Sequence, residues 1–218
     1  MGSFASRADL KAIEAEAAWE DRDLPRSMYA FLSRTKDAHG ARPALSYQLL
    51  STPGSKSETL TWADLHGRVT QATNLFRSLG VGEGDVVAYV MPNTVETAVT
   101  LLGGSVAGKV NPINPLLEAE QISAILRETK AKVVVTVRAF PKTDLAQKVA
   151  EAVKHAPSVK AVLEVDLLRY LGGVKRLIVP LIRPKNPVSH TAKAASPSDP
   201  TEVLVDPRGV EAGCAQDG

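Results

Sequence analysis

The chain has 218 residues, of which 44% are hydrophobic and 23% are charged, a composition typical of a globular protein that is long enough to bury a core. A net charge of only +2 and an aromatic content of 5% exclude a strongly basic surface with many stacking side chains, so we expect no nucleic-acid partner. No run approaches the roughly 20 consecutive apolar residues of a membrane-spanning helix, so no transmembrane segment is expected.

Two helices are predicted at the start of the chain, over residues 8–22 and 27–38. The Leu24-Pro25 pair separates them, because proline cannot continue a helix from the preceding turn. The first twenty residues mix alanine with acidic residues and contain no apolar core, so the sequence predicts no signal peptide. We expect residues 1–42 to form a unit of N-terminal helices.

A hairpin and a strongly marked helix follow. Residues 43–49 and 58–61 are predicted strands, joined by the turn-rich segment 51–57. Thr61 and Asp64 then have the spacing of a capping box, with Asp where Glu is usual. Apolar residues recur at helical spacing after this cap, and they are Leu65, Val69, Ala72, Phe76 and Leu79. Gly80 is expected to end the helix.

The next part of the chain alternates apolar strands with helices. Strands are predicted over 85–91, 132–137 and 159–165, and helices over 94–108, 118–130 and 143–155. Such alternation indicates an α/β fold with a mostly parallel sheet and helices on both faces. Right-handed crossovers are expected to connect the strands.

Residues 103–109 have the glycine and lysine spacing of a phosphate-binding loop, but this interpretation fails on two counts. Position 110 is Val110, where a Ser or Thr hydroxyl would be needed for Mg²⁺. Pro112 and Pro115 follow directly, so no helix can begin at Lys109 to direct its N-terminal amides at a phosphate. We therefore expect this segment to be the C-terminal end of a helix.

Several segments match a known family in order and at its spacing. They are residues 60–65, 79–88, 91–96, 107–115 and 131–136. Together they resemble the core motifs of the AMP-forming acyl-CoA synthetases, which are adenylate-forming ligases. The resemblance implies that residues 43–183 form part of the AMP-binding domain, with the fold of the N-terminal subdomain of these ligases.

The resemblance also implies a parent reaction. Such a ligase uses ATP and Mg²⁺ to convert a fatty acid or another carboxylate into an acyl-adenylate, and CoA then displaces AMP. The phosphates are bound by a loop rich in Ser, Thr and Gly that ends in Pro-Lys, and residues 184–218 contain no such loop. None of the family's catalytic residues therefore transfers to this chain, and we expect the chain alone to be inactive and to bind no cofactor of its own.

The composition changes abruptly after residue 183, where apolar periodicity stops and prolines accumulate. We expect residues 184–218 to be disordered or to come from a shifted reading frame, as in a truncated ligase. The alternative is a stand-alone paralogue that serves as a non-catalytic binding or regulatory module. The only cysteine, Cys214, allows no internal disulfide and favours a cytoplasmic location.

Few residues are candidates for a site. The resemblance implies that the CoA phosphates bind near Arg138 and Lys142, although two solvated charges in a loop are the simpler interpretation. The four histidines are scattered without the spacing of a zinc site, so no metal ligand is predicted. Residues 167–182 combine apolar with basic side chains, which predicts a buried segment with Lys and Arg at its edge or, alternatively, a peripheral membrane contact.

Overall fold

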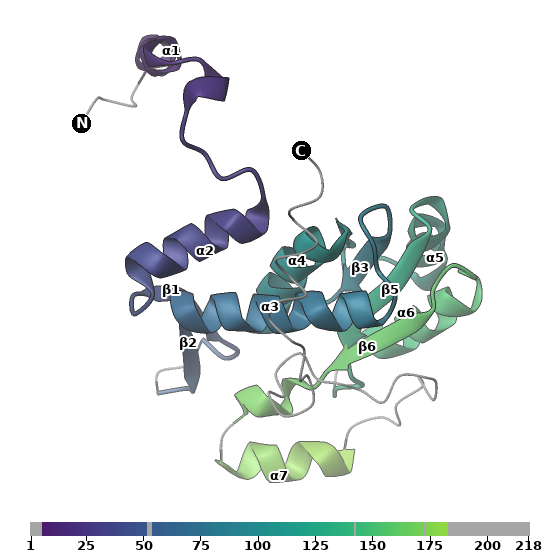
Figure 1. Cartoon of the computed structure of the whole chain (residues 1–218). Helices are drawn as coiled ribbons and strands as arrows, with labels where there is room; N and C mark the ends of the chain where they lie inside the picture. Colours follow the sequence, from purple (N-terminus) through teal and green to yellow (C-terminus); the bar gives the residue numbers. More distant parts are fainter. Residues whose placement is uncertain (1–5, 52–53, 142, 172, 183–218) are drawn as a thin grey trace.

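The computed structural model describes residues 6–51, 54–141, 143–171 and 173–182. Lys142 and the tail predicted over 184–218 lie outside the described residues, so neither prediction is tested here. Figure 1 shows the arrangement, with a central sheet flanked by helices and with the first helix set apart at the N-terminal end.

The central sheet is parallel, as the alternation of strands and helices predicts. It contains β3 (Val86–Val90), β4 (Lys109–Pro112), β5 (Ala131–Val137) and β6 (Ala161–Val165), in the order β4-β3-β5-β6. Within the described residues, β4 and β6 are therefore its edge strands. A separate antiparallel hairpin pairs β1 (Pro43–Gln48) with β2 (Ser57–Thr61).

Sequence analysis missed strand β4, because Pro112 at its end and Pro115 just beyond it argue against a regular element. Pro112 is the last residue of β4 and lies opposite Tyr89 of β3. Proline is tolerated at the end of an edge strand, where its missing N–H costs no ladder hydrogen bond. The pairing continues one residue further, since the amide of Ile113 donates to the carbonyl of Tyr89 at 2.9 Å.

Helices cover both faces of the sheet. In the sheet order β4-β3-β5-β6, the connection from β3 to β4 runs in one direction across the sheet and the connection from β4 to β5 runs in the opposite direction. If both crossovers are right-handed, their helices lie on opposite faces of the sheet. Accordingly α4 (Val95–Ala107) joins α3 (Trp62–Ser78) on one face, while α5 (Ala119–Glu128) and α6 (Leu145–Lys154) lie on the other (Figure 1). Helix α2 (Met28–His39) packs against α3.

The capping box of α3 is confirmed. The hydroxyl of Thr61 accepts a hydrogen bond from the amide of Asp64 at 3.1 Å, and the carboxylate of Asp64 accepts from the amide of Thr61 at 3.0 Å. The hydroxyl of Thr61 also donates to the carboxylate of Asp64 at 2.7 Å, and this hydrogen bond, followed by the one from the Thr61 amide, lowers the pKa of Asp64. The predicted apolar face is buried at four positions, which are Leu65, Val69, Ala72 and Phe76. Gly80 follows the helix with a φ of +81°, in the left-handed region that glycine adopts without strain.

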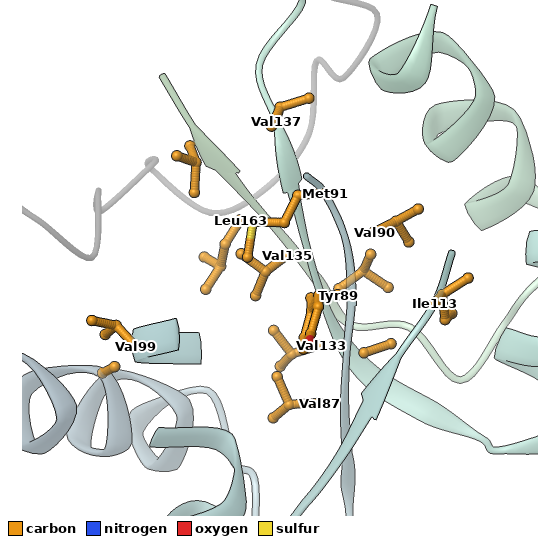
Figure 2. Packing of buried hydrophobic residues seen from close by; sticks show 14 of the residues in the cluster. Val87, Tyr89, Val90, Met91, Val99, Ile113, Val133, Val135, Val137 and Leu163 are labelled. Carbon is orange, nitrogen blue, oxygen red and sulfur yellow. The ribbon is translucent and has the colours of Figure 1, made fainter. Parts of the chain in front are cut away.

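The core lies between the two helical layers and within the sheet itself. Three consecutive residues of β5, Val133, Val134 and Val135, are fully buried, so both faces of the strand are covered. Figure 2 shows side chains of β3, β5 and β6 packed together in this core. Leu32 of α2 belongs to the same core. The predicted boundary at residue 42, between the N-terminal helices and the rest of the chain, stays a prediction.

The two ends of the described chain differ from expectation. The helix predicted over 8–22 is instead α1 (Arg7–Glu16) followed by the short η1 (Trp19–Asp21), because Ala17 is extended and ends α1. At the other end, η2 (Leu167–Tyr170) is buried as predicted. The prediction of burial is wrong for α7 (Gly173–Ile182), where Leu177 is 73% exposed. No described helix combines the length and apolarity needed to cross a membrane.

Candidate functional site

The carboxyl edge of the sheet is where this topology favours a ligand. In open α/β sheets, ligands bind outside the carboxyl ends of the strands, at the point where neighbouring strands lead to opposite faces. Here that point lies between β3, which continues into α4, and β5, which continues toward α6. The hydroxyl of Thr136 in β5 donates to the carbonyl of Val90 in β3 at 2.9 Å, which ties the two strand ends together.

Arg138 lies at this edge, directly after β5. Its amide donates to the carbonyl of Val165 at 2.9 Å, and its guanidinium lies 3.6 Å from the carboxylate of Asp166. The side chain of Arg138 is 45% exposed and that of Asp166 is 35% exposed, so solvent screens the pair. An anion bound by Arg138 must therefore compete with a neighbouring carboxylate, a constraint that the sequence did not reveal.

A partly buried network of charged side chains occupies the same edge of the molecule. Glu96, in the first turn of α4, is only 2% exposed, and its carboxylate accepts hydrogen bonds from the Tyr170 hydroxyl at 2.6 Å and from the Arg169 guanidinium. The same guanidinium donates to Glu58 of the hairpin, which also pairs with Arg68 of α3 at 3.0 Å. We call these five residues the Glu96 network.

The Glu96 network is balanced in charge and in hydrogen bonding. Two carboxylates face two guanidinium groups, and the N-terminus of α4 adds a favourable dipole for Glu96. Burial, and then the hydrogen bond to Glu96, raises the pKa of Tyr170 well above its usual value, so the phenol remains a donor. Every member has a partner within the network, which makes it suited to fixing structure rather than to binding a charged ligand.

Sequence analysis predicted none of the contacts of the Glu96 network, although Arg169 and Tyr170 fall within the segment 167–182 that was expected to be buried with basic residues at its edge. Glu96 falls within the segment 91–96 that carries the family resemblance, but its role was not predicted. Arg169 pairs with Glu58, which is 111 positions earlier in the chain, and no local pattern signals such a contact.

The segment 103–109 is structural, as predicted. Helix α4 ends at Ala107 and strand β4 begins at Lys109, which is the reverse of the strand-to-helix order of a phosphate-binding loop. A Cβ atom on Gly103 would lie 2.9 Å from the Cβ of Ala72, so this glycine permits close packing of α4 on α3. A Cβ atom on Gly108 would lie 2.5 Å from the carbonyl oxygen of Gly82 and 2.6 Å from that of Asp85.

A shallow groove of about 390 Å³ lies between α5 and α6. Two of its polar side chains pair with protein groups, since Arg127 donates to Ser123 at 2.7 Å and Glu151 accepts from Lys154 at 2.6 Å. In the described part of the chain, no group of three or more His, Cys, Asp or Glu residues is placed to bind a metal ion.

Comparison with known sequences assigns residues 32–203 to the family described as AMP-binding enzyme. The acetyl-coenzyme A synthetase of Sodalis glossinidius (strain morsitans) is 34% identical in an alignment of 147 residues, and the match covers 65% of this chain and 22% of that protein. The probable acyl-activating enzyme 12, peroxisomal, of Arabidopsis thaliana is 31% identical over 125 residues, 57% of this chain and 20% of that protein. The chain thus spans about a fifth of the length of these relatives.

Solved structures confirm the fold expected from the resemblance. The inhibitor-bound N-terminal domain of FACL13 from Mycobacterium tuberculosis matches with a TM-score of 0.54 and 20% identity, over 65% of this chain and 34% of that chain. A benzoate CoA ligase from Burkholderia xenovorans LB400 matches with a TM-score of 0.52 and 22% identity, over 65% of this chain and 26% of that chain. Since the family match extends over more than half of its length, the chain belongs to the AMP-binding enzyme family.

Proposed function

We propose that this chain is the N-terminal part of an ATP-dependent, AMP-forming ligase that joins a fatty acid or another carboxylate to CoA. The observation that carries the proposal is the family match over residues 32–203, combined with the parallel sheet that the N-terminal domain of FACL13 shares. ATP, Mg²⁺ and CoA are the cofactors and substrates that such a parent enzyme requires. We also propose a cytoplasmic location for this chain, because its one cysteine allows no internal disulfide.

We further propose that the chain alone does not form an acyl-adenylate. Adenylation needs several backbone amides, a lysine and Mg²⁺ to offset the charge that develops on the phosphates. Residues 184–218 lack the loop that provides these groups in the family, and Arg138, at the carboxyl edge, already faces Asp166.

Pyrophosphate exchange tests this proposal. The purified chain is expected to show no exchange of labelled pyrophosphate into ATP above the blank with acetate, benzoate or a long-chain fatty acid, because the transition state lacks its phosphate donors. A full-length acyl-CoA synthetase at the same concentration is the positive control. Exchange that depends on an added carboxylate would contradict the proposal of inactivity, while leaving the family unchanged.

In the full-length parent ligase, Arg138 and Lys142 remain our proposed contacts for the CoA phosphates. Replacement of Arg138 by alanine is expected to weaken CoA binding about threefold, the size of one solvent-exposed ionic contact. Asp166→Asn is expected to strengthen binding by a similar factor, because it removes the competing negative charge but keeps the side-chain oxygen that accepts from the amide of Leu168.

Isothermal titration of CoA into the full-length parent ligase that carries each substitution measures both effects. Arg127→Ala, which removes a cation from the α5–α6 groove, is the matched control and is expected to leave CoA affinity unchanged. Equal losses in Arg127→Ala and Arg138→Ala would show a general charge effect and would argue against a site at Arg138.

A further inference from the structure

Helix α1 is set apart from the rest of the molecule (Figure 1). Its start is well defined, because the amide of Asp9 donates to the hydroxyl of Ser6 at 3.3 Å and the carboxylate of Asp9 accepts from the amide of Ser6 at 3.0 Å. Against the described chain, however, none of its ten residues is buried. Helices shorter than about 12–15 residues are marginal in water, so α1 needs a surface on which to pack.

Helices α1 and α2 each expose an apolar side. In α1, Leu10 is 53% exposed, and the partly exposed Ile13 lies three positions later on the same side of the helix. In α2, Met28 and Phe31 are also three positions apart and are 43% and 51% exposed, and Leu24, just before the helix, is 46% exposed. We call the first pair the α1 apolar side and the other three residues the α2 apolar side.

The connector between the two helices holds α1 away from the α2 apolar side of its own chain. The guanidinium of Arg22 donates to the carbonyls of Ile13 at 2.7 Å and Ala17 at 3.2 Å, which ties the end of α1 to the connector. Arg34 of α2 donates to the carbonyl of Asp23 at 2.7 Å and pairs with its carboxylate at 3.1 Å, which ties the connector to α2. With these contacts in place, α1 projects away from α2 (Figure 1) and is free to reach another chain.

The charges around the two apolar sides are complementary. Residues 6–21, which include α1, contain five acidic and two basic side chains, whereas residues 22–42, which include α2, contain five basic and two acidic side chains. Glu14, one turn after Leu10, is exposed, and so is Arg34, three positions after the last residue of the α2 apolar side. Contact between α1 of one chain and α2 of another therefore joins opposite charges, whereas α1 with α1, or α2 with α2, would join like charges.

We infer that the chain forms a symmetric dimer, in which the α1 apolar side of each copy packs on the α2 apolar side of the other. Two equivalent contacts then form at once, and groups of the described chain cover all four apolar sides. Both surfaces lie before residue 32, where the match to the AMP-binding enzyme family begins, so they are outside the segment that the rest of such a domain is expected to cover. This inference goes beyond the proposed function and does not depend on it, because dimerisation requires neither nucleotide nor CoA.

Sedimentation equilibrium of the whole chain tests the inference. The parent chain is expected to show twice its monomer mass of 23.2 kDa at micromolar concentration. Leu10→Asp and Phe31→Asp are each expected to raise the Kd of the dimer by about tenfold or more, because each places a charge in an apolar contact. Leu116→Asp is the matched control, since Leu116 is 83% exposed but lies in the β4–α5 loop, and it is expected to leave the Kd unchanged.

A mixture of the two variants identifies which surfaces pair. In the mixed dimer, α1 of the Phe31→Asp copy meets α2 of the Leu10→Asp copy, so one of the two contacts is unaltered. The mixture is therefore expected to contain more dimer than either variant alone at the same total concentration. Circular dichroism of each variant shows that it is folded.

Disulfide trapping locates the contact independently. With Cys214→Ser as background, Leu10→Cys and Phe31→Cys chains carry one cysteine each, so every disulfide joins two chains. Under mild oxidation, their mixture is expected to form more linked dimer than either variant alone. A monomeric parent chain, a dimer that Leu10→Asp and Phe31→Asp both retain, an equal loss in Leu116→Asp, or linkage mainly between identical variants would each overturn the inference.

Discussion

Replacement of Glu96 by alanine is expected to lower the free energy of unfolding by about 3–5 kcal/mol, the usual result of removing one partner from a buried ion pair. The carboxylate is 2% exposed and accepts from both Arg169 and Tyr170. Its loss leaves the buried Tyr170 hydroxyl without its acceptor and leaves the partly buried Arg169 guanidinium with Glu58 alone. Since domains of this size are stable by about 5–15 kcal/mol, the variant is expected to unfold at a much lower urea concentration.

Urea unfolding followed by circular dichroism measures this loss, with Glu120→Ala as the matched control. Glu120 is also in the first turn of its helix but is exposed, so its removal is expected to change stability by less than about 0.5 kcal/mol. Glu96→Gln keeps an acceptor for the Tyr170 hydroxyl, so its loss of stability is expected to lie between those of Glu96→Ala and Glu120→Ala. Equal losses for Glu96→Ala and Glu120→Ala would show that the Glu96 network does not stabilise the fold.

A second large effect is expected at Gly108, where alanine should lower the free energy of unfolding by about 1–3 kcal/mol. The added methyl group would lie 2.5 Å and 2.6 Å from the carbonyl oxygens of Gly82 and Asp85. Both contacts are with backbone, which cannot rotate away as a side chain can. The amide of Lys109 also donates to the carbonyl of Asp85 at 2.8 Å, so relief of the clash would weaken the start of β4.

Gly67→Ala is the control, and it is expected to change the free energy of unfolding in the opposite direction. Gly67 lies inside α3, and no atom approaches within 4 Å of the position that its Cβ would occupy. Alanine there is expected to raise the free energy of unfolding by about 0.5–1 kcal/mol, because it has the higher helix propensity. Thermal melts of both variants check the pair of predictions. If Gly108→Ala has the same melting temperature as the parent chain, the close contact between residue 108 and the backbone of Gly82 and Asp85 is refuted.

Local signals predicted most of the fold but little of the candidate site. Helix α3 could be predicted because Thr61, Asp64 and the apolar spacing that follows all indicate the same element. Strand β4 was missed because its pairing with β3 overrides the irregular backbone that proline suggests. The Glu96 network was missed for a different reason, since Glu58 and Arg169 meet only after the hairpin and the end of β6 are brought together.

The two edge strands of the parallel sheet have unequal capacity to accept a neighbour. β4 is four residues long and ends in Pro112, so it offers a short row of donors that proline interrupts. β6 has five residues and no proline, and within the described part of the chain it pairs only with β5. A further strand is therefore expected to pair with β6 (Ala161–Val165) rather than with β4. That strand could come from a longer polypeptide or from another molecule.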